Sequence, residues 1–287
     1  MKRCLRCDAT FASGDWTCPS CGGRPSEGPG YLLFAPELAG GGFGDADYAF
    51  EAIEAAEARH FWFVARRRLV LWALGRYFGG ARSVLEVGCG TGFVLEGIQR
   101  ARPGLLLAGT DVLGASLGRA ARRLPGVDLF QMDGRRIPFR EEFDALLALD
   151  VIEHIDEDED ALTEMRNALR PGGGLVLTVP QHPWLWSELD AWSGHKRRYR
   201  RSELVARLEG AGLRLERMTS FAALVLPLLV LARRRRTKQF DPLAEVRLHG
   251  MVNALLRVPS ALERGLIAAG VSLPAGGSLL AVARRPA

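Results

Sequence analysis

The chain has 287 residues, of which 48% are hydrophobic and 25% charged, and its formal net charge is +5. This composition is typical of a globular protein and excludes an intrinsically disordered chain, and the length is large for one domain but small for two. Only three of the 38 basic residues are lysines, so the charge reflects uniform arginine usage and says little about nucleic-acid binding.

The amino-terminal sequence MKRCLRCDAT reaches two cysteines before any apolar run, which does not fit a secretory signal peptide. The chain has no window of about 18 uncharged apolar residues, so we expect no membrane-spanning helix. We therefore expect a cytoplasmic protein, in which thiols stay reduced and cysteine clusters hold metal more often than they form disulfides.

Four of the five cysteines form two C-x-x-C pairs, Cys4 with Cys7 and Cys18 with Cys21. Two such pairs form a closed tetrahedral thiolate site that suits zinc, so residues 1–24 resemble a short zinc ribbon. A redox dithiol is the alternative, although one pair would be enough for it. We expect structural zinc, a docking role toward a partner protein or the rest of the chain, and a Pro/Gly/Ser-rich linker at 25–45.

Residues 59–78 have the pattern of an amphipathic helix, and SVLEVGCGTG at 83–92 follows as an apolar strand, a glycine turn and the start of a helix. Glycines at 88, 90 and 92 let a ligand approach the backbone closely. A dinucleotide fingerprint would need glycine at position 93, where Phe93 stands.

Downstream, strands and helices alternate as in a parallel β/α sheet. The predicted strands are 105–112, 127–133, 143–155 (running into a loop) and 174–180, with helices at 114–124 and 158–170. Ligands in such sheets bind at the carboxyl ends of the strands. We expect the following residues to meet there: Glu86, Gly88 to Gly92, Asp111, Asp133 and Asp150.

Residues 80–221, together with 278–285, resemble a class I S-adenosylmethionine-dependent methyltransferase, most closely the group that includes the ubiquinone- and menaquinone-pathway enzymes. The resemblance rests on VLEVGCGTG, GTDV, QMDGRRIPF, FDALLALDVIEHI and LRPGGGLVLTVP, in this order. It implies a Rossmann-like α/β domain at 46–287, with a seven-stranded, mostly parallel sheet. The last strand, 278–285, would be antiparallel and lie beside the sixth, 213–221, with a helical, apolar insertion at 222–277.

The resemblance also implies S-adenosylmethionine as the cofactor. Asp111 would accept hydrogen bonds from both ribose hydroxyls, Asp133 would bind the adenine amino group, and Glu86 would lie against the methionine part. N-capping is the structural alternative for the two aspartates. The complete set of expected cofactor-binding residues is Glu86, Gly88, Cys89, Gly90, Gly92, Asp111, Val112, Asp133, Gly134 and Asp150.

Methyl transfer from a sulfonium needs orientation first, and it needs a base only where the acceptor loses a proton. Three histidines are alternative candidates for the base: His154, His195 and His182. Similar enzymes carry E-x-x-E-H at the position of His154, and some hold a divalent metal there. Plain loop hydrogen bonding remains the other interpretation for each histidine.

Aromatic residues cluster on the predicted acceptor side, which favours an aromatic or lipid-like acceptor. Packing in the core is the alternative for such a stripe. The expected substrate contacts are Trp62, Phe63, Arg67, Trp184, Trp186 and Tyr199.

The insertion opens on FAALVLPLLVLARRRR, residues 221–236, in which twelve uncharged residues precede four arginines. A twelve-residue helix covers about 18 Å, less than the roughly 30 Å of a bilayer core. We expect either an interfacial helix on anionic lipid, with 251–270 as its amphipathic partner, or a buried lid or dimer face.

The sequence thus favours O- or C-methylation of a hydrophobic small-molecule or lipid-linked acceptor, by a cytoplasmic enzyme that is peripheral on the inner membrane face if the insertion binds lipid. The alternatives are an RNA or protein methyltransferase that docks through the zinc ribbon, and a non-catalytic zinc-ribbon interaction protein that binds the cofactor. No N/D-P-P-Y motif follows the fourth strand, which disfavours amino-methylation of nucleic acid.

Overall fold

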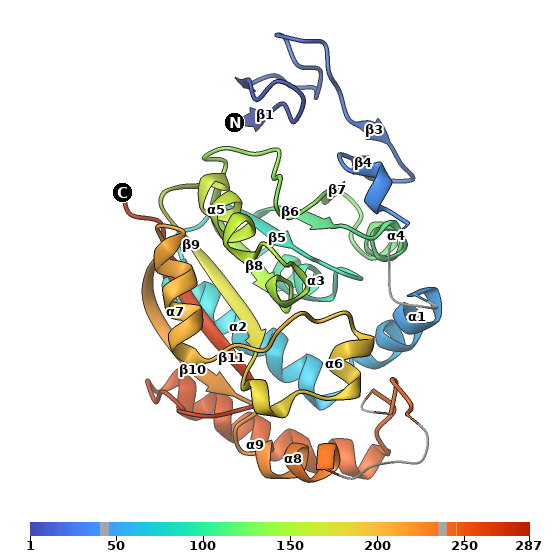
Figure 1. Cartoon of the computed structure of the whole chain (residues 1–287), viewed down its shortest axis with the longest axis vertical. Coiled ribbons are helices and arrows are strands. Elements are labelled where there is room, and N and C mark those ends of the chain that lie inside the picture. The colour runs from blue at the N-terminus through green and yellow to red at the C-terminus, as the bar shows by residue number, and fades with distance from the viewer. Residues whose placement is uncertain (41–45, 235–239, 245) are drawn as a thin grey trace.

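A twisted β-sheet with helices on both faces forms the centre of the computed structural model, which describes residues 1–40, 46–234, 240–244 and 246–287 (Figure 1). Within these residues the central sheet has nine strands. In spatial order they are β10 (Arg214–Phe221), β11 (Ser278–Arg284), β9 (Leu169–Pro180), β8 (Phe143–Leu149), β5 (Ser83–Val87), β6 (Leu106–Asp111), β7 (Asp128–Gln131), β4 (Leu32–Leu33) and β3 (Ser26–Glu27).

The sheet is parallel from β9 through β7, and β11 lies antiparallel between β9 and β10. All five residues of β5 are buried, as expected for a central strand covered on both faces. The predicted Rossmann-like fold and its inserted antiparallel strand are therefore confirmed. β9 begins at Leu169, five residues earlier than predicted, because the PGGG segment continues the strand instead of separating it from the preceding helix.

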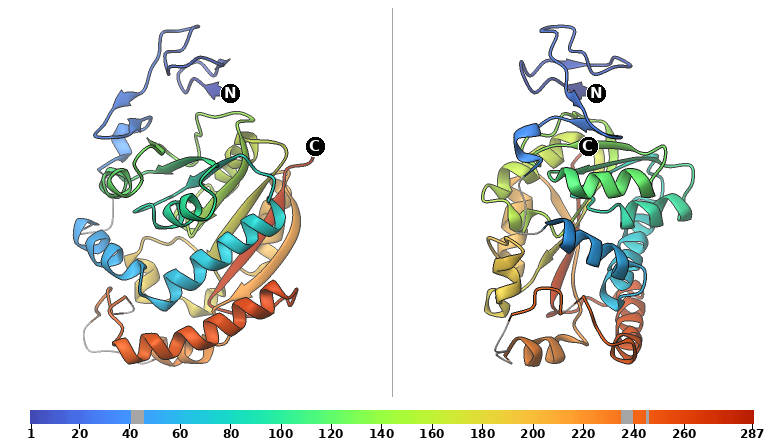
Figure 2. Two further views of the ribbon diagram at one scale, coloured as in Figure 1. Left: turned by 180° about the vertical axis from the view of Figure 1, so that it is seen from behind. Right: turned by 90° about the vertical axis from the view of Figure 1, so that its right-hand side faces the viewer.

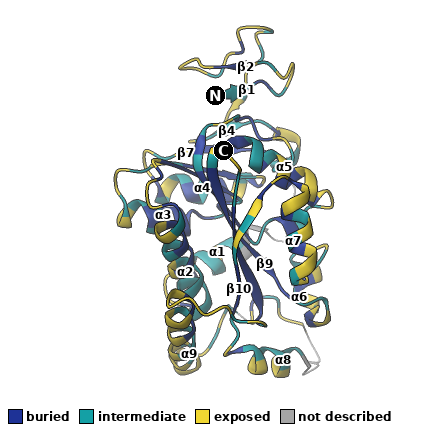
Figure 3. Cartoon of the chain, turned by 90° about the vertical axis from the view of Figure 1, so that its left-hand side faces the viewer, coloured by how far each residue is buried: buried dark blue, intermediate teal, exposed yellow. Residues whose placement is uncertain are grey.

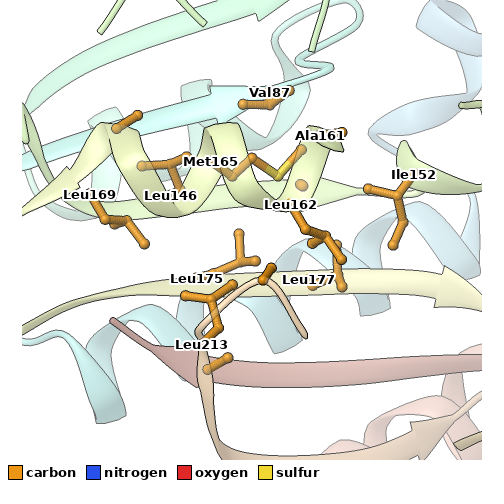
Figure 4. Packing of buried hydrophobic residues seen from close by; sticks show 14 of the residues in the cluster. Val87, Leu146, Ile152, Ala161, Leu162, Met165, Leu169, Leu175, Leu177 and Leu213 are labelled. Atoms are coloured by element: carbon orange, nitrogen blue, oxygen red, sulfur yellow. The ribbon is translucent and has the colours of Figure 1, made fainter. Parts of the chain in front are cut away.

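Helices cover the two faces of the sheet and enclose two hydrophobic cores (Figures 2 and 3). One core lies beneath α5 and α7, where Leu162 and Met165 of α5 pack against Leu146 and Leu177 of the sheet (Figure 4). The other lies beneath α2, α3 and α4. The helices are α1 (Ala46–Glu57), α2 (Phe61–Tyr77), α3 (Phe93–Ala101), α4 (Gly114–Arg123), α5 (Asp158–Ala168), α6 (Glu188–Trp192), α7 (Arg201–Gly210), α8 (Leu226–Arg234) and α9 (Gly250–Ala268).

The cysteine-rich segment 1–24 contains a small hairpin of β1 (Lys2–Arg3) and β2 (Thr10–Phe11) and docks onto the domain. The indole of Trp16 meets the rings of Phe34, Phe130 and Phe139 edge-on, with centroids 4.8 to 5.5 Å apart. Segment 25–45, expected to be a linker, contributes β3 and β4, which extend the sheet beyond β7. The ribbon thus packs against the edge of the sheet, and the segment that follows it pairs with that edge.

The insertion 222–277 forms α8 and α9 at the end of the molecule opposite the ribbon (Figures 1 and 2). Pro227 lies in the first turn of α8, where its missing N–H is tolerated, and does not interrupt the helix. Arg235 and Arg236 of the predicted basic run lie outside the described residues. No helix in the described part of the chain is long and apolar enough to cross a bilayer.

Candidate functional site

A cavity of about 690 Å³ opens at the carboxyl ends of β5, β6, β7 and β8, beside the start of α2. Its volume is typical of small-molecule sites, roughly 300–1,000 Å³. The structure brings thirteen of the predicted site residues to its walls: Trp62, Phe63, Glu86, Gly88, Cys89, Gly90, Asp111, Val112, Asp133, Gly134, Asp150, His154 and His195.

The glycine turn after β5 forms one wall of this cavity. Gly88 has a left-handed φ of 71°, and a Cβ there would lie 2.4 Å from Cγ2 of Val151, so no other residue fits. A Cβ on Gly90 would meet no atom within 4 Å, so the space beside this residue is open to a ligand. The turn therefore combines close packing behind it with free space in front.

Asp111 fixes the glycine turn to the end of β6. Its Oδ2 accepts a hydrogen bond from the Gly90 N–H at 2.9 Å, and its Oδ1 accepts one from the Leu113 N–H at 2.9 Å. Burial raises the pKa of Asp111, and these backbone donors oppose the shift. Each oxygen keeps a second lone pair, so the carboxylate can still accept two hydroxyl groups from a ligand.

Glu86 is a buried acid on β5 whose Oε2 has no hydrogen-bond partner within the described structure. Burial raises its pKa to about 8, although the positive charge of Arg66 opposes the shift. A buried carboxyl group with an unsatisfied oxygen at a cavity wall suits a ligand that brings its own donor or positive charge.

Asp133 follows β7 and is held by Arg135. The Arg135 Nε donates to both carboxylate oxygens at 3.0 Å, and Nη2 donates to Oδ2 at 2.7 Å. Although partial burial opposes ionisation, these hydrogen bonds hold the pKa of Asp133 below its usual value. Asp133 is thus an ionised acceptor at the cavity wall, as its predicted role requires.

The first turns of α2 form the apolar wall of the cavity. Arg66 lies over the Trp62 ring, with its guanidinium carbon 4.4 Å from the ring centroid, and pairs with the Asp150 carboxylate. Trp62 and Phe63 meet edge-to-face with centroids 5.1 Å apart. The Arg66–Asp150 ion pair therefore joins this aromatic wall to the end of β8.

Two of the candidate histidines meet at the acceptor side. The rings of His154 and His195 lie edge-to-face, with centroids 4.7 Å apart. Burial, followed by the proximity of His195, lowers the pKa of His154 to about 4, so His154 is neutral near pH 7. Glu153, His154 and His195 each bring one ligand atom within 4.8 Å of the others, so this cluster could also hold a metal ion.

His195 is oriented by Asp190, a buried acid on α6. The His195 Nδ1 lies 2.9 Å from Asp190 Oδ1, and Arg198 and Arg233 pair with the same carboxylate. Burial opposes ionisation of Asp190, but hydrogen bonds from His195 and Arg198 outweigh it and hold the pKa of Asp190 far below its usual value. Because an ionised carboxylate only accepts, the shared proton sits on Nδ1, and in the neutral imidazole Nε2 is then the unprotonated nitrogen.

Six predicted site residues lie outside the cavity walls. Gly92 caps α3, Arg67 covers the Phe93 ring at 3.9 Å, and the Tyr199 hydroxyl donates to Asp158 inside the core. His182 packs beside Trp184, and Trp184 and Trp186 are exposed.

Sequence reasoning missed several cavity residues, chiefly Glu57, Arg66 and Lys196. Arg66 follows Trp62 by four positions, so the helical period places both on one face of α2. Arg67 follows Phe63 by the same four positions, so this spacing alone does not select Arg66. Glu57 lies in α1 and binds the Thr91 hydroxyl of the glycine turn, a long-range contact that no local pattern indicates.

The residues present fit S-adenosylmethionine, the cofactor that the resemblance implies. The open space beside Gly90, the unsatisfied oxygen of Glu86 and the ionised acid at Asp133 supply the acceptors and the close backbone approach that such a ligand requires. When bound, the cofactor supplies an activated methyl group.

The four cysteines of the ribbon also converge. The Sγ atoms of Cys4 and Cys21 lie 3.6 Å apart, and those of Cys7 and Cys18 lie 3.7 Å apart. All four ligand atoms lie within 4.8 Å of one another. A tetrahedral zinc site with bonds of about 2.3 Å places its sulfurs roughly 3.8 Å apart, so the geometry is compatible with zinc.

Comparison with known proteins matches residues 85–177 to a family of methyltransferase domains. The demethylmenaquinone methyltransferase of Renibacterium salmoninarum is 35% identical over 118 residues, 41% of this chain and 48% of that protein. The ubiquinone biosynthesis O-methyltransferase of Alkalilimnicola ehrlichii is 27% identical over 109 residues, 34% of this chain and 41% of that protein. The chain thus spans about half the length of these curated relatives.

Among solved structures, phosphoethanolamine N-methyltransferase 2 of Haemonchus contortus, in complex with S-adenosyl-L-methionine, superposes with a TM-score of 0.56. It is 19% identical and covers 84% of this chain and 57% of that chain, so the likeness concerns the fold. Residues 85–177 therefore resemble a methyltransferase domain, as predicted, and the solved structure supports the predicted fold.

We expect Asp111→Ala to reduce S-adenosylmethionine affinity at least about 100-fold, because the two hydrogen bonds expected from the ribose hydroxyls to this carboxyl group are lost. Isothermal titration calorimetry measures the change. Asp128→Ala, at the exposed start of β7, is the matched control and should bind like the wild type. Equal affinities of the Asp111→Ala variant and the wild type would remove Asp111 from the cofactor site.

Glu86 should make the free energy of unfolding depend on pH. Between its unfolded pKa of about 4.3 and its folded pKa of about 8, the folded protein retains a proton that the unfolded chain has lost. Wild-type stability should therefore fall as pH rises through this window, by on the order of 4 kcal/mol from this group. Urea unfolding of cofactor-free Glu86→Gln should lack that fall, and parallel wild-type and variant profiles would contradict the shift.

Proposed function

We propose that this protein transfers the methyl group of S-adenosylmethionine to an oxygen or carbon atom of a hydrophobic small-molecule or lipid-linked acceptor. One observation carries the proposal: the glycine turn and the strand-end acids line the same cavity as the aromatic start of α2 and the paired histidines. A cofactor held by the glycine turn and the strand-end acids would present its methyl group toward the aromatic residues and the paired histidines, as in-line transfer requires.

The acceptor side supports a hydrophobic substrate. Trp62, Phe63, Ile155 and Trp192 line the cavity there, and the charges of Arg66 and Asp150 neutralise each other. The names of the two curated relatives, one from menaquinone and one from ubiquinone synthesis, point to the same chemical class. An aromatic acceptor would stack on these rings while its hydroxyl or ring carbon faces the cofactor.

His195 is the best-supported base among the three candidates. Its Nδ1 is committed to Asp190, its ring lines the cavity, and Nε2 is left to accept a proton from an acceptor hydroxyl. His154 is a weaker base, because burial lowers its pKa to about 4, and His182 does not line the cavity.

The basic run at 196–201 does not favour the nucleic-acid alternative. Lys196 pairs with Asp156, Arg197 with Asp158 and Arg200 with Glu203, while Arg198 is buried against Asp190. Cations already paired with acids offer little to a phosphate backbone, where binding depends on free positive charge.

We also propose that the four converging thiolates hold one structural zinc ion, and that the metal supports the docked ribbon. The ribbon touches the segment that follows Asp133: Arg3 N–H donates to Pro138 O at 3.0 Å, and Arg136 Nη2 donates to Leu5 O at 2.6 Å. Arg3 also pairs with Glu164 of α5. A metal-stabilised ribbon would therefore stiffen the loop beside the expected adenine position.

For the zinc site, we expect about one equivalent of zinc in the purified wild type and none in Cys18→Ser, because the buried Cys18 thiolate closes the tetrahedron. Elemental mass spectrometry measures the metal, and limited proteolysis should cut the ribbon of the variant faster. Cys89→Ser, outside the cluster, is the matched control and should keep its zinc. A zinc-free wild type would exclude the proposed metal site.

The methyl-transfer proposal is tested by incubating the protein with methyl-labelled S-adenosylmethionine and extracts of lipids, small molecules, RNA and protein. We expect label in an apolar fraction by mass spectrometry, and label only in RNA or protein would overturn the proposed acceptor class. His195→Gln should lower kcat by about 10²- to 10⁴-fold with cofactor affinity unchanged.

His182→Gln is the comparison variant for the assignment of the base, because the His182 ring lies outside the cavity walls. We expect it to keep a wild-type kcat. A larger loss in His182→Gln than in His195→Gln would show that the base has been assigned to the wrong residue.

A further inference from the structure

The insertion helix α9 has two opposite faces, and among the described residues only one of them packs against the rest of the fold. On the packed face, Asn253 Oδ1 accepts from the Phe61 N–H at 2.7 Å, and Ile267 is fully buried. The buried Glu263 carboxylate accepts from the N–H groups of Ala222 and Ala223, both at 2.6 Å. These contacts fix the orientation of α9 against α2 and the end of β10, so its other face is held outward.

The outward face of α9 is an apolar stripe. Its members recur every three or four residues. They are Met251 (76% exposed), Leu255 (72%), Val258 (68%), Leu262 (59%) and Leu266 (36%). With a rise of 1.5 Å per residue, the stripe is about 22 Å long. Large exposed apolar patches on a globular protein mark interaction sites.

The neighbouring helix α8 repeats the pattern on a smaller scale. Leu224, just before α8, is 43% exposed, and Leu228 and Leu231 within α8 are 57 and 49% exposed; the three are spaced by four and three residues. α8 and α9 both lie at the end of the molecule away from the zinc ribbon, and the right-hand view of Figure 2 shows them apart from each other. We call the exposed apolar residues of these two segments the insertion surface.

The charge of the chain identifies the partner of this surface. Residues 222–277 contain eight arginines and lysines and three acids, whereas the rest of the chain contains thirty of each sign. The whole formal net charge of +5 therefore belongs to the segment that carries the insertion surface. Two copies of such a surface would repel each other, whereas an anionic lipid surface attracts basic residues and accepts apolar side chains.

We propose that the insertion surface of α8 and α9 docks the protein onto an anionic membrane, with the leucine-rich stripes entering the interfacial layer. The cavity and the docking helix share one neighbouring side chain in this arrangement: Trp62 lines the main cavity and also a small pocket against Ser260, Glu263 and Arg264 of α9. This proposal goes beyond methyl transfer by naming the surface from which a hydrophobic acceptor would arrive.

Vesicle flotation with the full-length protein tests the proposal, and neither cofactor nor acceptor is added, so the result is independent of methyl transfer. We expect the wild type to float with phosphatidylcholine vesicles that contain phosphatidylglycerol, to bind pure phosphatidylcholine weakly, and to dissociate as salt rises. Leu255→Gln/Leu262→Gln should bind the anionic vesicles at least about tenfold more weakly, because two leucines no longer transfer from water.

The double variant should fold normally, because both side chains are exposed and glutamine is a good helix former. Circular dichroism and thermal melting check this. Leu106→Gln is the matched control for the single variant Leu255→Gln, since Leu106 is 73% exposed on β6, outside the insertion, and Leu255 is 72% exposed. The control should bind vesicles like the wild type, and Leu255→Gln should bind more weakly.

Three results would overturn the proposal. The first is a wild type that does not float with the anionic vesicles, and the second is a double variant that floats as well as the wild type. The third is a wild-type dimer in light scattering that the double variant converts to a monomer while neither binds vesicles. That last result would assign the insertion surface to a second copy of the chain.

Discussion

The buried carboxylate of Asp190 is the interaction on which the acceptor side of the molecule depends. It is 1% exposed and is shared by His195, Arg198 and Arg233 of α8. An acid buried this deeply needs such partners, because its desolvation is otherwise costly. The same bonds hold α6, the loop that carries His195 and the first helix of the insertion at fixed positions. The orientation of His195 and the placement of α8 are therefore coupled through one side chain.

The sheet and the cofactor side followed from the sequence because their signals are local. Buried strands read as continuous apolar runs, and a parallel sheet gathers whatever follows each strand at one edge. Glu86, Gly90, Asp111 and Asp133 each lie within three residues of a strand end, so predicting the strands was enough to predict that they meet. Here the residue pattern and the topology carry the same information.

The acceptor side was predicted less completely because its contacts join segments far apart in sequence. Asp190 carries no motif, and its importance depends on Arg233, 43 residues away. Tyr199 looked like a substrate residue in a basic loop, but its hydroxyl binds the buried Asp158, 41 residues earlier. The strands β3 and β4 have two residues each, too few to show an alternating pattern, and they form only because β7 offers an open edge.

The uneven distribution of charge along the chain affects how the molecule approaches a charged surface. With thirty acids and thirty bases outside the insertion, the rest of the protein has no net attraction or repulsion toward a charged object, while the insertion carries all the excess. The ribbon and the insertion lie at opposite ends, so the excess positive charge of the insertion lies at the end of the molecule away from the ribbon. A negatively charged surface would turn the protein by torque before any contact is made, so that encounters begin with the insertion foremost and the ribbon trailing.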